Sequence, residues 1–387
     1  MTYFGYVKND FKFKHIVNYV IVGAALILFT VLQLVGAIPR STSYLLTQIS
    51  YSIILAVSLN LVVGFLGELS LGHAGFMCAG AYIGCYFGGI LSEYIGSKLL
   101  VLIISMLIGG IVAAVFGLIV GLPALRLKGD YLAIVTLAFG EIVRNLCKNV
   151  PWFGKSLGLS TKTYGVKLFI VGFAVILIML ILLQNLIRSK HGRAITAIRD
   201  NEIAARAMGI NVTYYKLFVF VFSAFFAGVA GVLYGNYATP VLYSFFSYNY
   251  SIEILVMVVL GGMGNITGSI ISATLITIAN FILTTKLSGD LAAIKNLVYA
   301  LILMVVVIFN NAPALQSFKE KFSFAALNDR IMEKKRAKNP EKFAADIRND
   351  SAQWSRIPTK ISMDEILSTD VVSNEGIRDE GDKPSAK

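Results

Sequence analysis

Long apolar runs recur along the first 310 residues of this 387-residue chain. Each run is roughly 17 to 25 residues long, the length that an α-helix needs to cross about 30 Å of hydrocarbon. In lipid, every backbone polar group must find its partner within the protein, so such runs fold as helices. Only 14% of the residues are charged and 56% are hydrophobic, unlike the composition of soluble domains. The sequence therefore predicts an all-α polytopic membrane protein.

The runs predict about ten transmembrane helices by their length. Their predicted bounds are residues 17–38, 44–66, 69–91, 99–122, 130–147, 166–187, 214–238, 246–263, 267–285 and 291–310. A glycine-rich stretch at Gly261–Asn265 interrupts the last long apolar region, which predicts two helices or broken helices there. A similar stretch, Gly67–Gly84, lies five spans earlier. The pair predicts a weak inverted repeat.

Lysine and arginine in the short loops predict the orientation in the membrane. The loops on the N-terminal side hold ten of these residues and the opposite loops hold six. Because basic loops stay in the cytoplasm, we expect both termini on the cytoplasmic side of the cell membrane. The net charge of +12 suits anionic inner-leaflet lipid. The basic residues are too scattered for a nucleic-acid partner.

Three regions follow from this pattern. Residues 1–16 are predicted to be a cytoplasmic N-terminus and residues 17–310 a transmembrane domain. Residues 311–387 form a tail with 14 basic and 13 acidic residues, predicted to be cytoplasmic, partly helical and finally disordered. The three cysteines lie in or beside spans without metal-ligand spacing, so we expect no metal site.

A charged segment, His191–Gly209, separates two of the longest apolar runs within a predicted loop over residues 188–213. Asp200 or Asn201 suits a helix N-cap, and Gly209 suits a left-handed helix end. These signals predict a helix of about two turns, which is too short to be stable alone in water. It must pack on the protein or on a partner. From these residues alone, a solvated connector and a docking site are equally open.

Polar residues at membrane depth are costly and often mark a transport pathway. Ser70 and His73 lie in the first glycine-rich stretch and could offer hydrogen bonds to a passing zwitterion, although tight helix packing explains the glycines equally well. Glu141 could instead be neutralised by Arg144, one helical turn away. The pathway candidates are Ser70, His73, Glu141 and Asn265. Glu68, Arg144 and Glu253 fit better as charges near span ends.

Four stretches resemble the permeases of branched-chain amino acid ABC importers. HGRAITAIRDNEIAARAMGINVTYYKLFVFVFSAFFAGVAGVLYG (His191–Gly235) resembles their cytoplasmic loop and the span after it, and GELSLGHAGFMCAGAYIG (Gly67–Gly84) resembles a motif of both permeases of the pair. LPALRLKGDYLAIVTLAFGEIVRN (Leu122–Asn145) is similar to the larger, LivM-type subunit, and VMVVLGGMGNITGSIISA (Val256–Ala273) is the fourth match. Together they cover most of residues 50–310, in the family's order.

The resemblance implies a prokaryotic importer with a second, LivH-type permease, two ABC ATPase subunits and an extracytoplasmic amino acid binding protein. Within the loop, Glu202, Ala204, Ala205 and Gly209 resemble the pattern by which ABC permeases engage their ATPase, with Ile203 interrupting the Glu-Ala-Ala order. The residues that we expect to carry this coupling are Arg193, Arg199, Asp200, Glu202, Ala204, Ala205 and Gly209.

The same resemblance implies that this chain is no enzyme and holds no cofactor, with ATP bound by the partner subunits. The sequence agrees, because it has no GxxxxGK[ST] phosphate loop. Two alternatives stay open. An ion-coupled secondary transporter would depend on Glu141, and a related ABC permease would carry urea or short amides.

Overall fold

The computed structural model of the chain describes residues 39–125, 127, 129–161 and 168–286, together with residues 22, 23, 27, 28, 30 and 304. All of these fall within the first of two units, residues 1–310 and 311–387. The predicted spans 17–38 and 291–310 lie almost wholly outside the described residues. The predicted N-terminus 1–16 and the charged tail lie outside them altogether, and their character stays a prediction.

The described residues are mostly helical, and the only β-type pairing among them is an isolated bridge between Leu159 and Val241. This confirms the predicted all-α membrane class. The α-helices are α2 (Arg40–Asn60), α3 (His73–Tyr94), α4 (Lys98–Ala124), α5 (Asp130–Asn149), α6 (Leu168–Arg188), α7 (Lys190–Asp200), α8 (Glu202–Ala207), α9 (Val212–Tyr237), α10 (Tyr248–Gly261) and α11 (Ile266–Lys286). The short turns are a π-helix, η1 (Leu61–Leu66), and three 3-10 helices, η2 (Pro151–Phe153), η3 (Lys155–Leu157) and η4 (Tyr243–Phe246).

Six helical segments in the described part of the chain are long and apolar enough to cross a membrane. They are α2 continued by η1, then α3, α4, α6, α9 and α11. Their ends agree with the predicted spans to within about one helical turn, which is the usual uncertainty of such boundaries. The predicted total of ten spans is not confirmed.

Three predicted spans differ from the structure. The span 69–91 begins only at His73, because the chain leaves the helix at Gly67, where φ is +81°. The span 246–263 is the 14-residue helix α10, about 21 Å long and too short to cross the hydrocarbon alone. The span 130–147 is α5, which carries four charged residues and lacks the apolar composition of the others.

Glycines allow α3, α4 and α9 to pack backbone against backbone. A Cβ atom added to Gly80 would lie 2.4 Å from the Cα of Gly228, and one added to Gly228 would lie 2.5 Å from the carbonyl oxygen of Gly109. Side chains cannot occupy that space, so small residues are required for this approach, as in other membrane helix pairs. The tight packing that the Gly67–Gly84 stretch predicted is therefore present.

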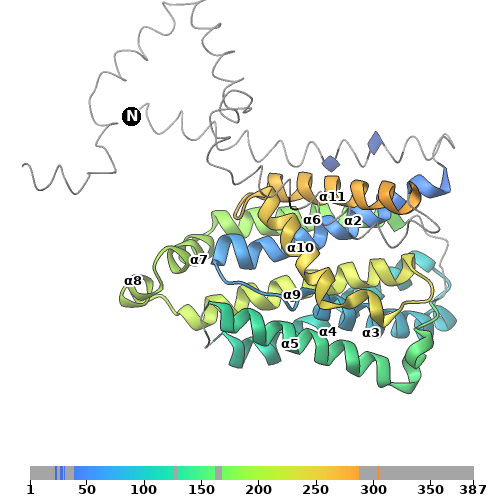
Figure 1. Ribbon diagram of the computed structural model, residues 1–387, viewed down its shortest axis with the longest axis horizontal. Helices are drawn as coiled ribbons and strands as arrows, with labels where there is room; N and C mark the ends of the chain where they lie inside the picture. The colour runs from blue at the N-terminus through green and yellow to red at the C-terminus, as the bar shows by residue number, and fades with distance from the viewer. Residues whose placement is uncertain are drawn as a thin grey trace, which may run out of the picture. The chain divides into compact units, whose positions relative to one another are not determined.

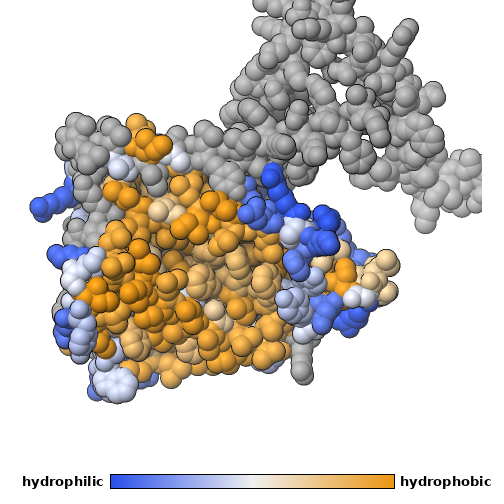
Figure 2. Space-filling view, turned by 180° about the vertical axis from the view of Figure 1, so that it is seen from behind, coloured by the Kyte–Doolittle hydropathy of each residue, from blue (hydrophilic) through white to orange (hydrophobic). Residues whose placement is uncertain are grey.

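The lateral surface is apolar, as a bilayer-spanning bundle requires. Figure 2 shows a broad hydrophobic face bounded at both ends by hydrophilic residues. On α4, exposed apolar side chains recur about one turn apart, at Leu107, Ile111, Val115 and Leu118. The helices run in broadly similar directions, and α7 and α8 project together at one end, which we call the insert end (Figure 1).

Candidate functional site

The charged insert folds into two short helices, α7 and α8. Ser189 Oγ accepts hydrogen bonds from two backbone N–H groups at the start of α7, and Asn201 Oδ1 accepts one from the Ala204 N–H at 3.0 Å at the start of α8. Gly209, with φ of +81°, turns the chain after α8. The predicted two-turn helix is therefore α8, capped by Asn201 rather than by Asp200.

Sequence reasoning missed α7, although its signals are present. Ser189 is a good N-cap residue, and Ile195 and Ile198, spaced by one turn, are both buried against the bundle. Asp200 and Asn201, which follow these residues, predicted only the later helix start, that of α8. As a result, the insert is a hairpin-like pair of helices rather than one helix.

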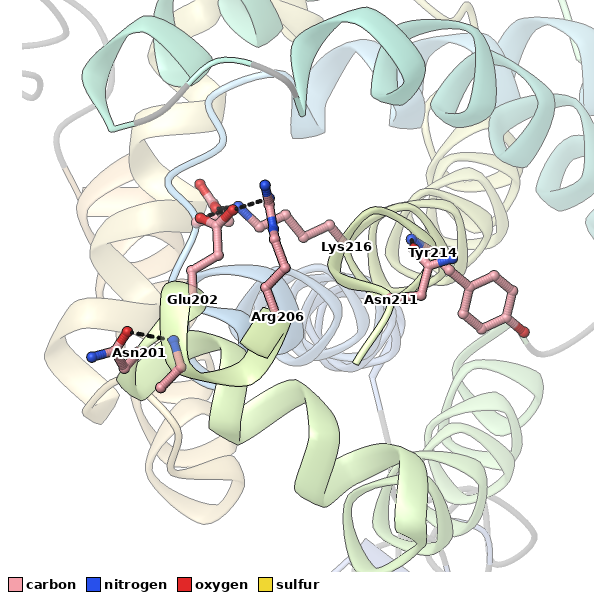
Figure 3. A network of polar contacts seen from close by, with 8 residues as sticks. Asn201, Glu202, Arg206, Asn211, Tyr214 and Lys216 are labelled. Atoms are coloured by element: carbon pink, nitrogen blue, oxygen red, sulfur yellow. Dashed lines mark hydrogen bonds and ion pairs between the residues drawn. The ribbon is translucent and has the colours of Figure 1, made fainter. Parts of the chain in front are cut away.

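A buried lysine holds α8 to the bundle (Figure 3). Lys216, in the first part of α9, has only 4% of its side chain exposed. Its ammonium group binds the Glu68 carboxylate and also the Oε2 atom of Glu202 at 3.2 Å. Arg206 adds a second cation to Glu202, with Nη2 2.9 Å from Oε1. Two carboxylates and two cations thus join the insert to the start of α9 and to the segment that precedes α3.

Arg199 makes a second connection between the insert and the bundle. Its Nη1 donates to the backbone carbonyl of Gly64 at 3.0 Å, and its Nε and Nη2 both donate to Asp200 Oδ1 at 3.1 Å. Gly64 lies in the last turn of η1, where backbone carbonyls lack partners within the helix. A cation at a helix C-terminus satisfies such a carbonyl and interacts favourably with the helix dipole.

The helix end held by Arg199 also contacts the turn between α10 and α11. Asn60, which is fully buried, accepts a hydrogen bond from the Gly264 N–H at 2.9 Å and donates one to Ser269 Oγ at 2.9 Å. A Cβ atom on Gly64 would lie only 2.1 Å from the Gly264 nitrogen. The predicted interruption after Gly261 is confirmed, and it packs on the interruption that follows α2.

The outer face of α8 differs from its base. Ile203 is 78% exposed and Met208 is 83% exposed, although both are large apolar side chains. They stand on a charged insert at one end of the bundle, away from the apolar lateral surface. A short helix with an apolar tip and a base fixed by ion pairs is suited to bind another protein.

A family profile described as "Branched-chain amino acid transport system / permease component" matches residues 41–308. This range includes the six described membrane-crossing segments, apart from Arg40 at the start of the first, together with both helix interruptions and the insert. The chain belongs to this family. Family membership and the six apolar helical segments together show a multi-pass membrane protein.

Relatives of this permease include both subunit types of the branched-chain systems. The LivM permease of Salmonella typhimurium is 35% identical over 276 residues, covering 62% of this chain and 63% of the relative. LivM of Methanocaldococcus jannaschii is 28% identical over 254 residues, covering 56% and 73%. LivH of Salmonella typhimurium is 22% identical over 303 residues, covering 73% and 94%. The chain spans a little under two thirds of the length of the Salmonella LivM protein.

The structure divides the permease's predicted coupling residues into two groups. Arg193, Asp200, Ala204 and Gly209 are exposed on the insert. By contrast, Ala205 is buried, and Glu202 and Arg199 bind the bundle through Lys216 and Gly64. Sequence reasoning did not single out Met208, and it noted Ile203 as the residue that interrupts the Glu-Ala-Ala order. The sequence signal that could have identified these exposed residues is a large apolar residue isolated within a polar stretch.

The predicted pathway residues are dispersed. Ser70 and His73 are buried at or just before the start of α3. The Nε2 atom of His73 lies 2.8 Å from Ser58 Oγ. The Ser70 hydroxyl has no hydrogen-bond partner among the described residues. Glu141 lies on α5 and pairs with Arg144. Asn265 is exposed and caps α11, accepting from the Gly268 N–H at 3.2 Å.

Proposed function

We propose that this permease is one channel subunit of an ATP-driven importer that carries branched-chain or other neutral amino acids across the cytoplasmic membrane of a prokaryote. In this proposal the insert end and both termini face the cytoplasm. Two ABC ATPase subunits bind ATP and dock at the insert, so this chain is not an enzyme and holds no cofactor. A second, LivH-type permease and an extracytoplasmic amino acid binding protein complete the importer.

The observation that carries the proposal is the construction of the insert. Its apolar tip, Ile203 and Met208, is exposed, whereas Glu202, which directly precedes Ile203, is bound by the buried Lys216. A solvated connector has no reason to present two large apolar side chains to water, so the structure favours docking over the connector interpretation. The relatives' names, which describe branched-chain amino acid permeases, support the substrate class.

The contacts at the base of the insert suggest how ATP hydrolysis would act on the channel. A rigid-body shift of α8 pulls on Glu202 and Lys216, and through them on Glu68, which precedes α3. A shift of α7 pulls on the end of η1 through Arg199. Small displacements at a docking site are passed on in this way by packed, hydrogen-bonded elements. The insert would therefore act on both sides of the interruption between η1 and α3.

An ion-coupled secondary transporter fits the geometry less well. Such a transporter would use Glu141 as its ion site, but a lone cation bound there would displace Arg144 and leave the guanidinium without its carboxylate partner. A competition experiment distinguishes amino acid transport from transport of urea or short amides. Unlabelled isoleucine should reduce the uptake of labelled leucine, and urea should leave it unchanged.

Docking at α8 can be tested by replacing the apolar tip. The variants Ile203→Ser and Met208→Ser should retain the membrane-inserted permease but lose the ATPase subunits on affinity purification. Leu157→Ser is the matched control, since Leu157 is equally large and 84% exposed but lies in η3, outside the insert. If both tip variants keep their ATPase subunits at the wild-type ratio, the docking proposal is wrong.

A further inference from the structure

One face of α5 is unlike any lipid-facing surface of the bundle. Ile134, Ala138, Glu141 and Asn145 recur at spacings of three and four residues, so they lie in one stripe along the helix. All four are exposed or partly exposed. The stripe is apolar in its first half and polar in its second half, whereas the exposed stripe of α4 is apolar throughout.

The polar half of the stripe contains an ion pair. The Nη2 atom of Arg144 lies 2.5 Å from Glu141 Oε2, and its Nε lies 2.8 Å from the same oxygen. The other oxygen, Oε1, accepts a hydrogen bond from the Tyr248 N–H at the start of α10, at 3.1 Å. The side chains of Arg144 and Glu141 are 24% and 25% exposed, so the pair is open on one side.

This pair lies well within the length of α5 rather than at either end of the helix. Glu141 and Arg144 are the twelfth and fifteenth residues of the 20-residue helix α5. They lie about 16 and 21 Å along a helix about 30 Å long, given a rise of 1.5 Å per residue. The neighbouring Gly140 packs on Gly75 near the start of α3: a Cβ on Gly75 would lie 2.5 Å from the Gly140 Cα. Charged side chains of a membrane-embedded helix face water or protein rather than lipid.

We propose that Glu141 and Arg144 form the head-group site of the transport pathway for a zwitterionic amino acid. The Arg144 guanidinium binds the substrate carboxylate, and the Glu141 carboxylate binds the substrate ammonium group. Because a zwitterion carries one charge of each sign, it can exchange with the internal ion pair without leaving an unpaired charge. The face of α5 then lines a water-accessible path instead of contacting lipid.

The neighbouring apolar side chains specify the class of substrate. Ala138 and Ile134 lie one and two turns from Glu141 on the same stripe and are exposed. Ala138, about 4.5 Å from Glu141 along the helix axis, would contact an aliphatic side chain while the head group stays on the ion pair. A small amino acid with an aliphatic side chain therefore fits the stripe. This inference rests on the proposed transport function and assigns its substrate contacts.

Cysteine labelling of the purified, assembled transporter tests the site without relying on ATP hydrolysis. We would introduce Asn145→Cys, one turn beyond Glu141, and label it with a charged, water-soluble thiol reagent. The matched control is Ile111→Cys, on the apolar stripe of α4, where the side chain is 56% exposed. The native cysteines Cys78, Cys85 and Cys147 are buried, so the wild-type protein gives the background.

We expect Asn145→Cys to react and Ile111→Cys not to react. Leucine at about nine times its dissociation constant should slow the labelling about tenfold, because about one site in ten is then empty. Leucinamide, which lacks the carboxylate, should give little protection. Adding Glu141→Gln or Arg144→Gln should abolish the protection by leucine while the cysteine stays reactive.

Three results would overturn this site. They are an unreactive Asn145→Cys, equal protection by leucine and leucinamide, and full protection by leucine when either charge has been removed. The comparison of leucine with leucinamide leaves the ion pair intact, so it stays valid if a charge variant fails to fold. Failure of the importer proposal would appear differently, as missing ATPase subunits or uptake that is independent of ATP.

Discussion

A single buried ammonium group holds the insert in place. Lys216 is buried, and it binds two carboxylates, from Glu68 and Glu202, that are far apart in the sequence. Taking charges out of water is costly, and the cost is offset only while each charge keeps its partners. The stability of this region therefore depends on the complete cluster rather than on any one pair.

Removal of this ammonium group should destabilise the permease strongly. Lys216→Met leaves two partly buried carboxylates side by side, and loss of one partner of a buried pair typically costs about 3–5 kcal/mol. We expect a clear fall in the thermal unfolding midpoint of the purified protein.

The matched control for that variant is Arg206→Met. Arg206 binds the same Glu202 carboxylate, but its side chain is 67% exposed, and exposed pairs contribute only about 0–1 kcal/mol. Its unfolding midpoint should stay close to the wild-type value. Equal losses in the two variants would contradict the role assigned to the buried lysine.

At the scale of helices, the closest contacts depend on glycines, which have no side chain. On α3, Gly80 faces the backbone of Gly228 on α9, whereas Gly89 on the same helix has no atom within 4 Å of an added Cβ. These two glycines differ in packing and share the same helix. They therefore allow the contribution of close approach to be separated from helix propensity.

We predict opposite effects for alanine at these two positions. Gly89→Ala should be neutral or stabilising, because alanine favours a helix by about 1 kcal/mol over glycine. Gly80→Ala should destabilise by about 1–3 kcal/mol, the usual cost of overpacking, because the backbone of α9 cannot yield as a side chain would. Thermal unfolding of both variants measures the difference, and similar midpoints would contradict the packing of α3 on α9.

The turn after α8 provides a test of coupling. Gly209 has a φ of +81° and open space around it, so Gly209→Val strains the backbone without a steric clash. We expect this variant to insert into the membrane and to separate ATP hydrolysis from leucine uptake, with uptake reduced more than hydrolysis.

The control for that strain is Gly129→Val. Gly129 also has positive φ, +59°, and no atom within 4 Å of an added Cβ, but it lies between α4 and α5. It should lose stability to a similar degree while keeping the wild-type ratio of uptake to hydrolysis. The coupling role of the insert is excluded if Gly209→Val keeps the wild-type ratio.

At the scale of the whole molecule, we expect ATP hydrolysis rather than an ion gradient to drive transport. Proteoliposomes that contain the assembled importer should take up labelled leucine only when ATP is present on the side of the ATPase subunits. Ionophores that abolish proton and sodium gradients should leave the initial rate unchanged. Uptake that stops with the gradients and continues without ATP would favour a secondary transporter that uses Glu141.

Much of the architecture could be predicted from local sequence because lipid leaves few choices. A run of about 20 apolar residues can satisfy its backbone in hydrocarbon only as a helix or in a closed barrel, so the described spans were located to within about one turn. The interruption at Gly261–Asn265 was also predictable, since glycine signals a helix end without reference to the rest of the chain. The short helix α10 and the charged helix α5 were harder, because length and composition there depart from those of a simple span.

The sequence by itself thus determined the membrane class, most helix positions and the presence of a charged insert, because each depends on residues close together in the chain. Only the tertiary structure decided which charges meet. Glu68, Glu202 and Lys216 form one cluster across separations of up to 148 residues, and Arg199 reaches the carbonyl of Gly64 across 135. No local pattern encodes such pairs, since they depend on how the helices pack. That packing turned Glu202 inward and left Ile203 and Met208 outside.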